Sequence, residues 1–241
     1  MERKIVITAD GSHSLFVKEL NEHYHSIHGA IQESQHVFIN AGLKYIISHL
    51  KSITSPLAPL VKKGEGNLVN EINILEIGLG TGLNAILTFI EAEQSVLNIH
   101  YTSLEAFPVS IDIANKLNYV ELLNSKKYQS VFNTMHSSDW EKDITLSKHF
   151  TLHKIKSTLQ EVELKNTFDL IYFDAFGPPV QPEMWTEKVF SKLFAATKPN
   201  SCLVTYCAKG EVKRTLKKVG FTVESLDGPP GKREMVRAVK N

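Results

Sequence analysis

The chain has 241 residues, of which 42% are hydrophobic and 22% charged, a composition ordinary for one large globular domain, or one domain with a small extension. The formal net charge of +1 means that the charge of the whole molecule does not point to a polyanion partner, although the charge can be unevenly distributed. No apolar run approaches the length of a membrane span, and the N-terminus lacks the apolar core of a signal peptide, so we expect a cytoplasmic protein that does not bind membranes.

The first part of the chain, residues 1–60, is predicted to be an extension packed on a main domain that spans residues 61–241. Residues 4–8 have the pattern of a short strand, and residues 37–50 carry apolar side chains at helical spacing. A histidine-rich stretch, residues 23–28, lies between them. It has no cysteine and no clear set of carboxylates beside it, so we predict no metal site.

A glycine-rich turn opens the main domain. The apolar run at residues 72–77 predicts a strand, residues 83–93 predict a helix, and three glycines lie at alternate positions between them: Gly78, Gly80 and Gly82. A strand that enters such a turn brings bare backbone N–H groups close to a ligand. The dinucleotide-binding fingerprint Gly-x-Gly-x-x-Gly does not fit, because Leu83 occupies its last position. The alternative is a tight strand-to-helix turn that binds nothing.

Strands and helices alternate through the rest of the chain. We predict strands at residues 99–105, 149–155, 168–174 and 201–207, helices at 108–118, 182–197 and 211–219, and a closing pair of strands at 221–226 and 234–239. This alternation predicts a doubly wound, mostly parallel α/β sheet with ligand sites at the carboxyl ends of its strands. The tail from Thr205 onward is richer in basic than in acidic residues, which fits either an anionic ligand or a solvated helix face.

Two carboxylates follow predicted strands. Glu105 ends the strand at 99–105, where a carboxylate has the geometry to accept hydrogen bonds from both hydroxyls of a ribose. A routine acidic residue at a strand end is the alternative. Asp174 follows the most apolar strand and begins the segment DAFGPP. This segment resembles the Asp/Asn-Pro-Pro-aromatic motif of many amino-group methyltransferases.

Methyl transfer to an amine gives Asp174 a chemical role. The nucleophile must be held about 3 Å from the methyl group with its lone pair aimed, and a primary amine with a pKa of about 10 is mostly protonated at neutral pH. Asp174 would bind and orient the amine and pass its proton to water, while Phe176 would stack on a base or shape the pocket. The alternative is that Asp174 caps the following helix or accepts from loop amides.

Several segments together resemble one family. They are residues 25–34 (HSIHGAIQES), 37–43 (VFINAGL), 104–108 (LEAFP), 174–186 (DAFGPPVQPEMWT) and 231–235 (GKREM), with the glycine turn. In this order they are similar to the methyltransferase domain of MnmC, the bacterial tRNA wobble-uridine enzyme family, over nearly the whole chain. The resemblance implies a class I, Rossmann-like methyltransferase fold that uses S-adenosyl-L-methionine.

The resemblance also implies a substrate and site residues. The reaction would be methylation of the aminomethyl group on C5 of uridine 34 in tRNA, giving 5-methylaminomethyl(-2-thio)uridine. Asp174 and Phe176 would be catalytic, and Lys232 and Arg233 would meet tRNA phosphate or brace their loop. Ser157 stands near the family's adenine-contacting Gly-Asp, which is Lys156-Ser157 here. The implied cofactor contacts are Gln32, Glu33, Ser34, Glu76, Gly78, Gly80, Gly82, Asn84, Glu105 and Ser157.

The family's bifunctional form has a second, flavin-dependent oxidase domain, for which 241 residues leave no room. The aminomethyl nucleoside would therefore come from another enzyme. Two alternatives stay open on the sequence alone: an amino methyltransferase that acts on a protein or a small amine, and a non-catalytic, cofactor-binding module that assists RNA binding.

Overall fold

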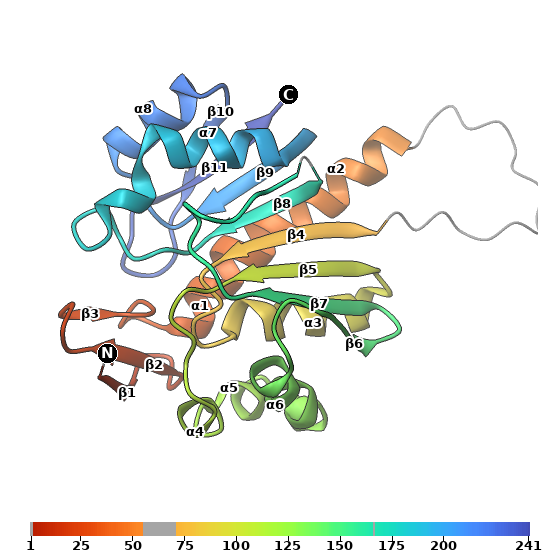
Figure 1. The fold of residues 1–241 in the computed structure, drawn as a ribbon, viewed down its shortest axis with the longest axis vertical. Helices are drawn as coiled ribbons and strands as arrows, with labels where there is room; N and C mark the ends of the chain where they lie inside the picture. The colour runs from red at the N-terminus through yellow and green to blue at the C-terminus, as the bar shows by residue number, and fades with distance from the viewer. Residues whose placement is uncertain (1, 55–70, 166) are drawn as a thin grey trace, which may run out of the picture.

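The computed structural model describes residues 2–54, 71–165 and 167–241. Its centre is one eight-stranded sheet (Figure 1). The strands of this sheet are, in chain order, β4 (Ile72–Ile77), β5 (Ile99–Leu104), β6 (Asp143–Ser147), β7 (Phe150–Ile155), β8 (Phe168–Phe173), β9 (Thr197–Thr205), β10 (Thr222–Asp227) and β11 (Glu234–Lys240). In space their order is β10-β11-β9-β8-β4-β5-β7-β6.

The five inner strands from β9 to β7 run parallel, and β6, β10 and β11 pair antiparallel at the two edges. β4 is the first strand of this sheet along the chain. The next strands are added on one side of it, toward β7, and the later strands on its other side, toward β9, so the direction of strand addition reverses at β4. Ligand sites in such sheets lie outside the carboxyl ends of the strands at this switch point. The predicted doubly wound, mostly parallel sheet is therefore confirmed.

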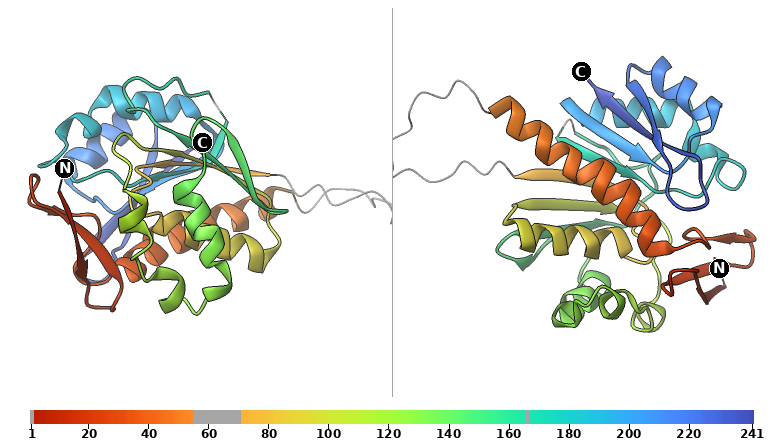
Figure 2. Two further views of the ribbon diagram at one scale, coloured as in Figure 1. Left: turned by 60° about the horizontal axis from the view of Figure 1, so that its bottom comes forward. Right: turned by 180° about the vertical axis from the view of Figure 1, so that it is seen from behind.

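Helices cover both faces of the sheet (Figure 2). One face carries α3 (Leu83–Ser95), α6 (Gln129–Ser137) and a long helix made of α1 (Ala30–Ser34), the π-helical η1 (Gln35–Lys44) and α2 (Tyr45–Thr54). The other face carries η3 (Pro182–Trp185), α7 (Glu187–Ala196) and α8 (Gly210–Lys218). The short segments α4 (Ile111–Ala114), α5 (Tyr119–Leu122) and η2 (Lys126–Tyr128) lead into α6.

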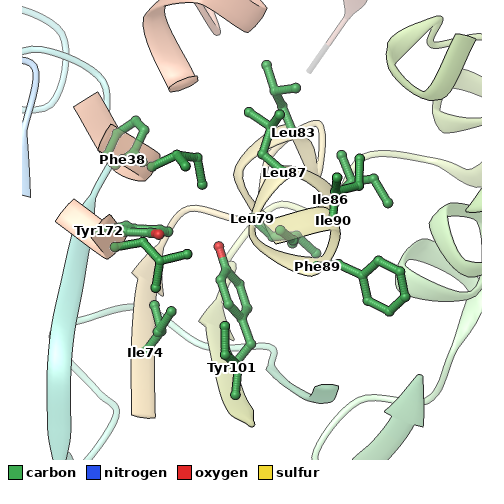
Figure 3. Packing of buried hydrophobic residues seen from close by; sticks show 14 of the residues in the cluster. Phe38, Ile74, Leu79, Leu83, Ile86, Leu87, Phe89, Ile90, Tyr101 and Tyr172 are labelled. Atoms are coloured by element: carbon green, nitrogen blue, oxygen red, sulfur yellow. The ribbon is translucent and has the colours of Figure 1, made fainter. Parts of the chain in front are cut away.

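The long helix packs tightly because it presents a glycine to the sheet. A Cβ atom on Gly42 would lie 3.0 Å from a methyl group of Val204 and 3.2 Å from the ring of Tyr172. Phe38, one turn earlier, packs on the Tyr172 ring at a centroid distance of 5.2 Å. Figure 3 shows both rings in the buried cluster with Tyr101 and the apolar side chains of α3. The extension is thus part of the core rather than an appendage.

The N-terminal residues form a small antiparallel sheet of β1 (Arg3–Ile7), β2 (His13–Val17) and β3 (Glu22–His23). It lies beside the carboxyl ends of the parallel strands (Figure 1). Arg3 Nη1 donates to the carbonyl of Pro108 over 3.0 Å, and the Tyr119 hydroxyl donates to the carbonyl of His13 over 2.8 Å. These contacts fix the small sheet over the region where ligand sites are expected.

Some predicted elements differ from those observed. A helix was predicted at residues 108–118, but only α4 forms in this range, after an extended Ser110. The carbonyls of Phe107 and Pro108 before it accept hydrogen bonds from Arg3. The edge strand β6 was not predicted. The helix predicted at residues 182–197 was expected to end at residue 197, but in the structure this residue is the first of β9. The predicted boundary between residues 60 and 61 lies outside the described residues, and no helix in the described part is long and apolar enough to cross a membrane.

Candidate active site

A cavity of about 560 Å³ lies at the carboxyl ends of β4, β5 and β8. Its volume falls in the usual range for small-molecule sites. It is lined by the glycine turn, by the loops after β5, β7 and β8, and by residues 20 and 22–28 of the extension. The cavity therefore sits at the switch point of the sheet. The predicted site residues that it brings together are Glu33, Gly78, Gly80, Asn84, Glu105, Ser157, Asp174, Phe176 and Lys232.

Gly78 brings the glycine turn against the segment that holds Asp174. Its φ of +91° is a backbone conformation that side chains rarely adopt, and a Cβ atom there would lie 3.1 Å from the carbonyl oxygen of Asp174. The Asp174 amide donates to the carbonyl of Ile77 over 3.2 Å. The turn and the acidic residue, nearly a hundred positions apart in sequence, are therefore in direct contact.

Glu105 is held by the backbone on both sides. Its Oε2 accepts from the amide of Gly80 at 2.9 Å and its Oε1 accepts from the amide of Phe107 at 2.7 Å. The side chain is only 9% exposed, yet it lines the cavity. Each carboxylate oxygen has lone pairs beyond the one it shares with an amide, so Glu105 remains able to accept from a ligand. The hydrogen bonds from Gly80 and Phe107 hold this carboxylate in one position.

Asp174 is one of the titratable groups that line the cavity. Burial raises the pKa of its carboxyl group to about 7, and the charge of Glu33 acts in the same direction. The amide Nδ2 of Asn84 donates to Asp174 Oδ2 over 2.8 Å, which together with Lys232 lowers the pKa but does not offset burial. At neutral pH this carboxyl group can therefore both accept and give up a proton.

Glu33, Lys232 and Tyr206 form a second polar group in the cavity. Lys232 Nζ lies 2.5 Å from Glu33 Oε1 and 3.8 Å from the centroid of the Tyr206 ring. The Tyr206 hydroxyl donates to the carbonyl of Ala175 over 2.9 Å. These contacts join the long helix, the loop between β10 and β11 that carries Lys232, and the loop after β8. They also show that the cavity accommodates an ammonium group between a carboxylate and an aromatic face.

The loop after β8 is fixed by its own residues. The Phe176 amide donates to Gln181 Oε1 over 3.0 Å, and Trp185 Nε1 donates to the Phe176 carbonyl over 2.8 Å. The Phe176 ring meets Tyr24 edge to face at 5.2 Å, so the small N-terminal sheet closes over it. Trp185 itself is buried against Phe173 and serves the packing of this loop.

Two predicted cofactor contacts lie behind the cavity wall. The side chain of Glu76 is fully buried, and its Oε2 accepts from Ser103 Oγ over 2.8 Å. It points into the core because it lies on the face of β4 that α3 covers. Gly82 is needed for packing: a Cβ atom there would lie 2.8 Å from Nε2 of His136. Neither residue is part of the cavity wall, and their role as cofactor contacts stays a prediction.

Three further predicted contacts also lie away from the cavity. Gln32 is exposed on the long helix, and Ser34 is buried within it. The helical period of 3.6 residues turns these neighbours of Glu33 away from the face that meets the cavity. The Arg233 side chain is 92% exposed and lies near Glu234. The roles predicted for Gln32 and Ser34 at the cofactor and for Arg233 at tRNA phosphate or in its loop therefore stay predictions, made for residues that do not line this cavity.

Residue patterns did not single out Tyr24, Tyr206 or Thr81, all of which line the cavity. Tyr206 follows β9, and its place after a parallel strand was a usable signal. Thr81 lies between the buried His25 and the partly buried His136: His25 Nε2 contacts its hydroxyl over 2.8 Å, and His136 Nε2 contacts its carbonyl over 3.2 Å. Among the described residues no group of three or more His, Cys, Asp or Glu is arranged to hold a metal ion.

Known proteins resemble this chain in sequence and fold. A bifunctional MnmC protein of tRNA 5-methylaminomethyl-2-thiouridine biosynthesis from Leptospira interrogans is 27% identical over 91% of the chain and 32% of its own length. One from Campylobacter hominis is 29% identical over 71% of the chain and 26% of its own length. The chain thus spans about a third or less of these curated relatives. The crystal structure of MNMC2 from Aquifex aeolicus matches the whole chain and 70% of its own with a TM-score of 0.73 at 22% identity, which shows a shared fold.

A family model described as S-adenosyl-L-methionine-dependent methyltransferase matches residues 117–241, just over half of the chain. This segment begins before α5 and includes the loop after β8 with Asp174, the strand before Tyr206 and the loop of Lys232. The match confirms the methyltransferase class and the cofactor that the family resemblance implied. The chain belongs to the S-adenosyl-L-methionine-dependent methyltransferase family.

Proposed function

We propose that the protein methylates the amine of 5-aminomethyl(-2-thio)uridine at wobble position 34 of tRNA, giving 5-methylaminomethyl(-2-thio)uridine. The observation that carries this proposal is the contact between the glycine turn and Asp174, whose carboxyl group has a pKa raised to about 7 by burial in the cavity. The names of the relatives from Leptospira and Campylobacter support the tRNA substrate. Such a substrate would place the activity in the cytoplasm.

The cavity residues fit S-adenosyl-L-methionine. Gly78 and Gly80 expose backbone without side chains, Glu105 offers carboxylate oxygens for ribose hydroxyls, and Ser157 offers a hydroxyl after β7. A cavity of about 560 Å³ is large enough for a nucleoside with an amino acid side arm. Glu33, whose carboxylate is buried, would be a further contact of the cofactor. When bound, the cofactor supplies an electrophilic methyl group on a positively charged sulfur.

Asp174 would bind and orient the substrate amine. A charged ammonium has no lone pair to attack with, and a primary amine with a pKa of about 10 is mostly charged in water. Inside the cavity, burial disfavours the charged amine and also raises the pKa of Asp174 to about 7. The two values therefore approach each other, and the proton moves from the amine to Asp174 and on to water at modest cost.

The Glu33–Lys232–Tyr206 group would tune the same site. Lys232 lowers the pKa of Asp174 and Glu33 raises it, so their ion pair balances charge beside the reacting amine. Lys232 would thereby brace its loop, one of the two roles expected for it. Arg233, whose side chain is 92% exposed on the same loop, would be the residue available to a tRNA phosphate. The aminomethyl nucleoside would be supplied by an activity that forms 5-aminomethyluridine in tRNA.

Nucleoside mass spectrometry tests the proposal. Bulk tRNA from cells that lack the gene should contain aminomethyl-uridine in place of the methylaminomethyl form, and purified protein with S-adenosyl-L-methionine should convert it. The Asp174→Asn protein is the control for conversion by contaminants. Unchanged nucleosides together with methylation of free amines or proteins would replace the tRNA substrate by that class. Cofactor binding without turnover on any of them would favour a non-catalytic module.

A further inference from the structure

One lysine binds the loop after β7, residues 156–165, at three points. Lys192 lies on α7, and its Nζ atom donates to three backbone carbonyls of this loop. The acceptors are Leu159 at 2.7 Å, Gln160 at 3.0 Å and Val162 at 2.8 Å. An ammonium group has three N–H donors. All of them are therefore used on one short stretch of backbone.

The loop itself has an irregular backbone. No residue of this loop, apart from its turn, has a regular hydrogen-bonded structure in the part that the structure describes. The turn begins at Thr158, whose carbonyl accepts from the amide of Val162 over 3.1 Å. The Leu159 side chain is 2% exposed and packs in the buried cluster that contains the apolar face of α7. The ammonium of Lys192 thus supplies three of the hydrogen bonds that hold this backbone.

This loop forms one wall of the cavity, next to Glu105. Its residues 157–160 line the cavity. The Glu105 amide donates to the carbonyl of Ile155 over 3.0 Å, so the loop leaves β7 beside this carboxylate. The neighbouring strands lie in the order β8, β4, β5 and β7. Asp174, the glycine turn, Glu105 and the loop therefore follow one another along the carboxyl edge of the sheet.

We propose that Lys192 is a positioning residue for the cofactor: it holds the loop after β7 in the shape that receives the adenine base. This rests on the proposed function, which places the methyl group near Asp174 and the ribose at Glu105. In S-adenosyl-L-methionine the sulfonium and the base are attached to opposite sides of the ribose. A cofactor that turns its sulfonium toward Asp174 therefore extends its base toward the loop. Lys192 does not line the cavity itself, so it acts through the loop.

The expected effect is on affinity and not on the chemical step. Without the ammonium, three carbonyls lose their donor and the loop is in the receiving shape for only part of the time. The apparent Kd of a ligand then rises by the inverse of that fraction. Because the base is bound equally in the ground state and in the transition state, turnover at saturating cofactor should change little.

Calorimetric titration tests the positioning with two ligands, S-adenosyl-L-methionine and 5′-methylthioadenosine, which has the base and ribose but no amino acid arm. Lys192→Met keeps most of the apolar stem and removes the donors, and should raise both Kd values roughly tenfold. Lys192→Arg keeps donors and should recover most of the loss. Lys188→Met, at an exposed position one turn earlier on α7, is the matched control and should stay within about twofold.

Hydrogen exchange separates positioning from a general loss of stability. In Lys192→Met the amides of the loop should exchange faster, while those of β4 stay protected. Faster exchange throughout the sheet, or unchanged Kd values, would overturn the proposal. A loss for S-adenosyl-L-methionine but not for 5′-methylthioadenosine would also contradict it, since the effect would then not lie at the base. Both titrations proceed without tRNA, so a protein that binds both ligands but methylates no tRNA would overturn the proposed function alone.

Discussion

Two aspartates on one segment of chain show how position decides chemistry. Asp169, near the start of β8, lies 2.8 Å from Lys198 and accepts from the amide of Asn73 at 2.8 Å. Asp174, just past the end of the same strand, accepts from a neutral amide in the cavity, and burial raises its pKa to about 7. Asp169 thus stabilises the sheet, whereas the pKa of Asp174 lies close to neutral pH, which allows its carboxyl group to take up and release a proton.

Replacing Asp174 should therefore affect turnover more than binding. We expect Asp174→Asn to lower kcat on the order of a hundredfold or more, through lost amine orientation and proton handling. Cofactor affinity should remain nearly unchanged. Steady-state kinetics and calorimetry measure the two effects, with the exposed Asp112→Asn as the matched control. Wild-type turnover in Asp174→Asn would remove this carboxylate from the reaction.

Glu105 should show the opposite pattern. In Glu105→Gln one carboxylate oxygen becomes an NH2 group that faces a backbone N–H, because Gly80 and Phe107 both donate to this side chain. We expect cofactor Kd to rise about 10- to 100-fold, the loss typical of a charge-assisted hydrogen bond. Calorimetric titration with S-adenosyl-L-methionine measures it, beside Glu163→Gln as the surface control. An unchanged Kd would argue against the ribose contact.

Among the elements, the glycine turn positions the site. The Gly78 backbone has a φ of +91° and leaves only enough room for the Asp174 carbonyl. Its neighbour Gly80, with a φ of +51°, donates to Glu105 while Tyr24 lies over it. One turn therefore sets the positions of both carboxylates. A side chain at Gly78 would displace the loop that carries Asp174.

A matched pair of glycines separates the two effects of Gly78. Gly11 has a similar φ of +83°, but a Cβ atom there would have no other atom within 4 Å. We expect both Gly11→Ala and Gly78→Ala to lose about 1–2 kcal/mol of unfolding free energy from backbone strain. Only Gly78→Ala should also lose methylation, by roughly tenfold or more, because misplacing a reacting group by a fraction of an ångström is costly. Urea unfolding and kinetics measure these outcomes; full activity in Gly78→Ala contradicts the contact.

At the scale of the whole molecule, distant segments meet at Thr81. His25 from the extension and His136 from α6 both contact this residue, and burial lowers the pKa of each histidine to about 4. Because a carbonyl only accepts, His136 must carry its proton on Nε2. Protonation of the second nitrogen in the folded state would bury a charge. Folding is therefore linked to keeping both rings neutral.

This linkage predicts a dependence on pH. The pKa of His136 is about 4 in the folded state and near 6.5 in the unfolded state, so between these values the unfolded chain binds more protons and wild-type stability falls as pH falls. In His136→Gln that contribution is absent. The difference in unfolding free energy between wild type and variant should be constant above pH ~7 and should shrink by about 1.4 kcal/mol per pH unit between pH ~6.5 and the folded-state pKa of about 4. A difference that does not vary with pH would show that the ring is not held neutral.

Much of the chemistry was readable from local sequence. The strand at residues 72–77, the alternate glycines and the acidic residues at strand ends are patterns of neighbouring residues, and the structure brings Gly78, Gly80, Glu105 and Asp174 to one cavity. The parallel sheet follows from the alternation of elements. A residue that directly follows a parallel strand lies at the edge of the sheet where the carboxyl ends of these strands meet. This part of its position can therefore be read from the sequence.

The sequence by itself thus determined the doubly wound fold, the methyltransferase chemistry and the two carboxylates at strand ends. The tertiary structure decided which face each residue presents. It placed Glu76 in the core, turned Gln32 and Ser34 from the cavity, and brought Tyr24 and Lys232 into it from opposite ends of the chain. The physical reason is that periodicity fixes the spacing of side chains along one element, whereas the contacts between elements depend on packing across the whole molecule.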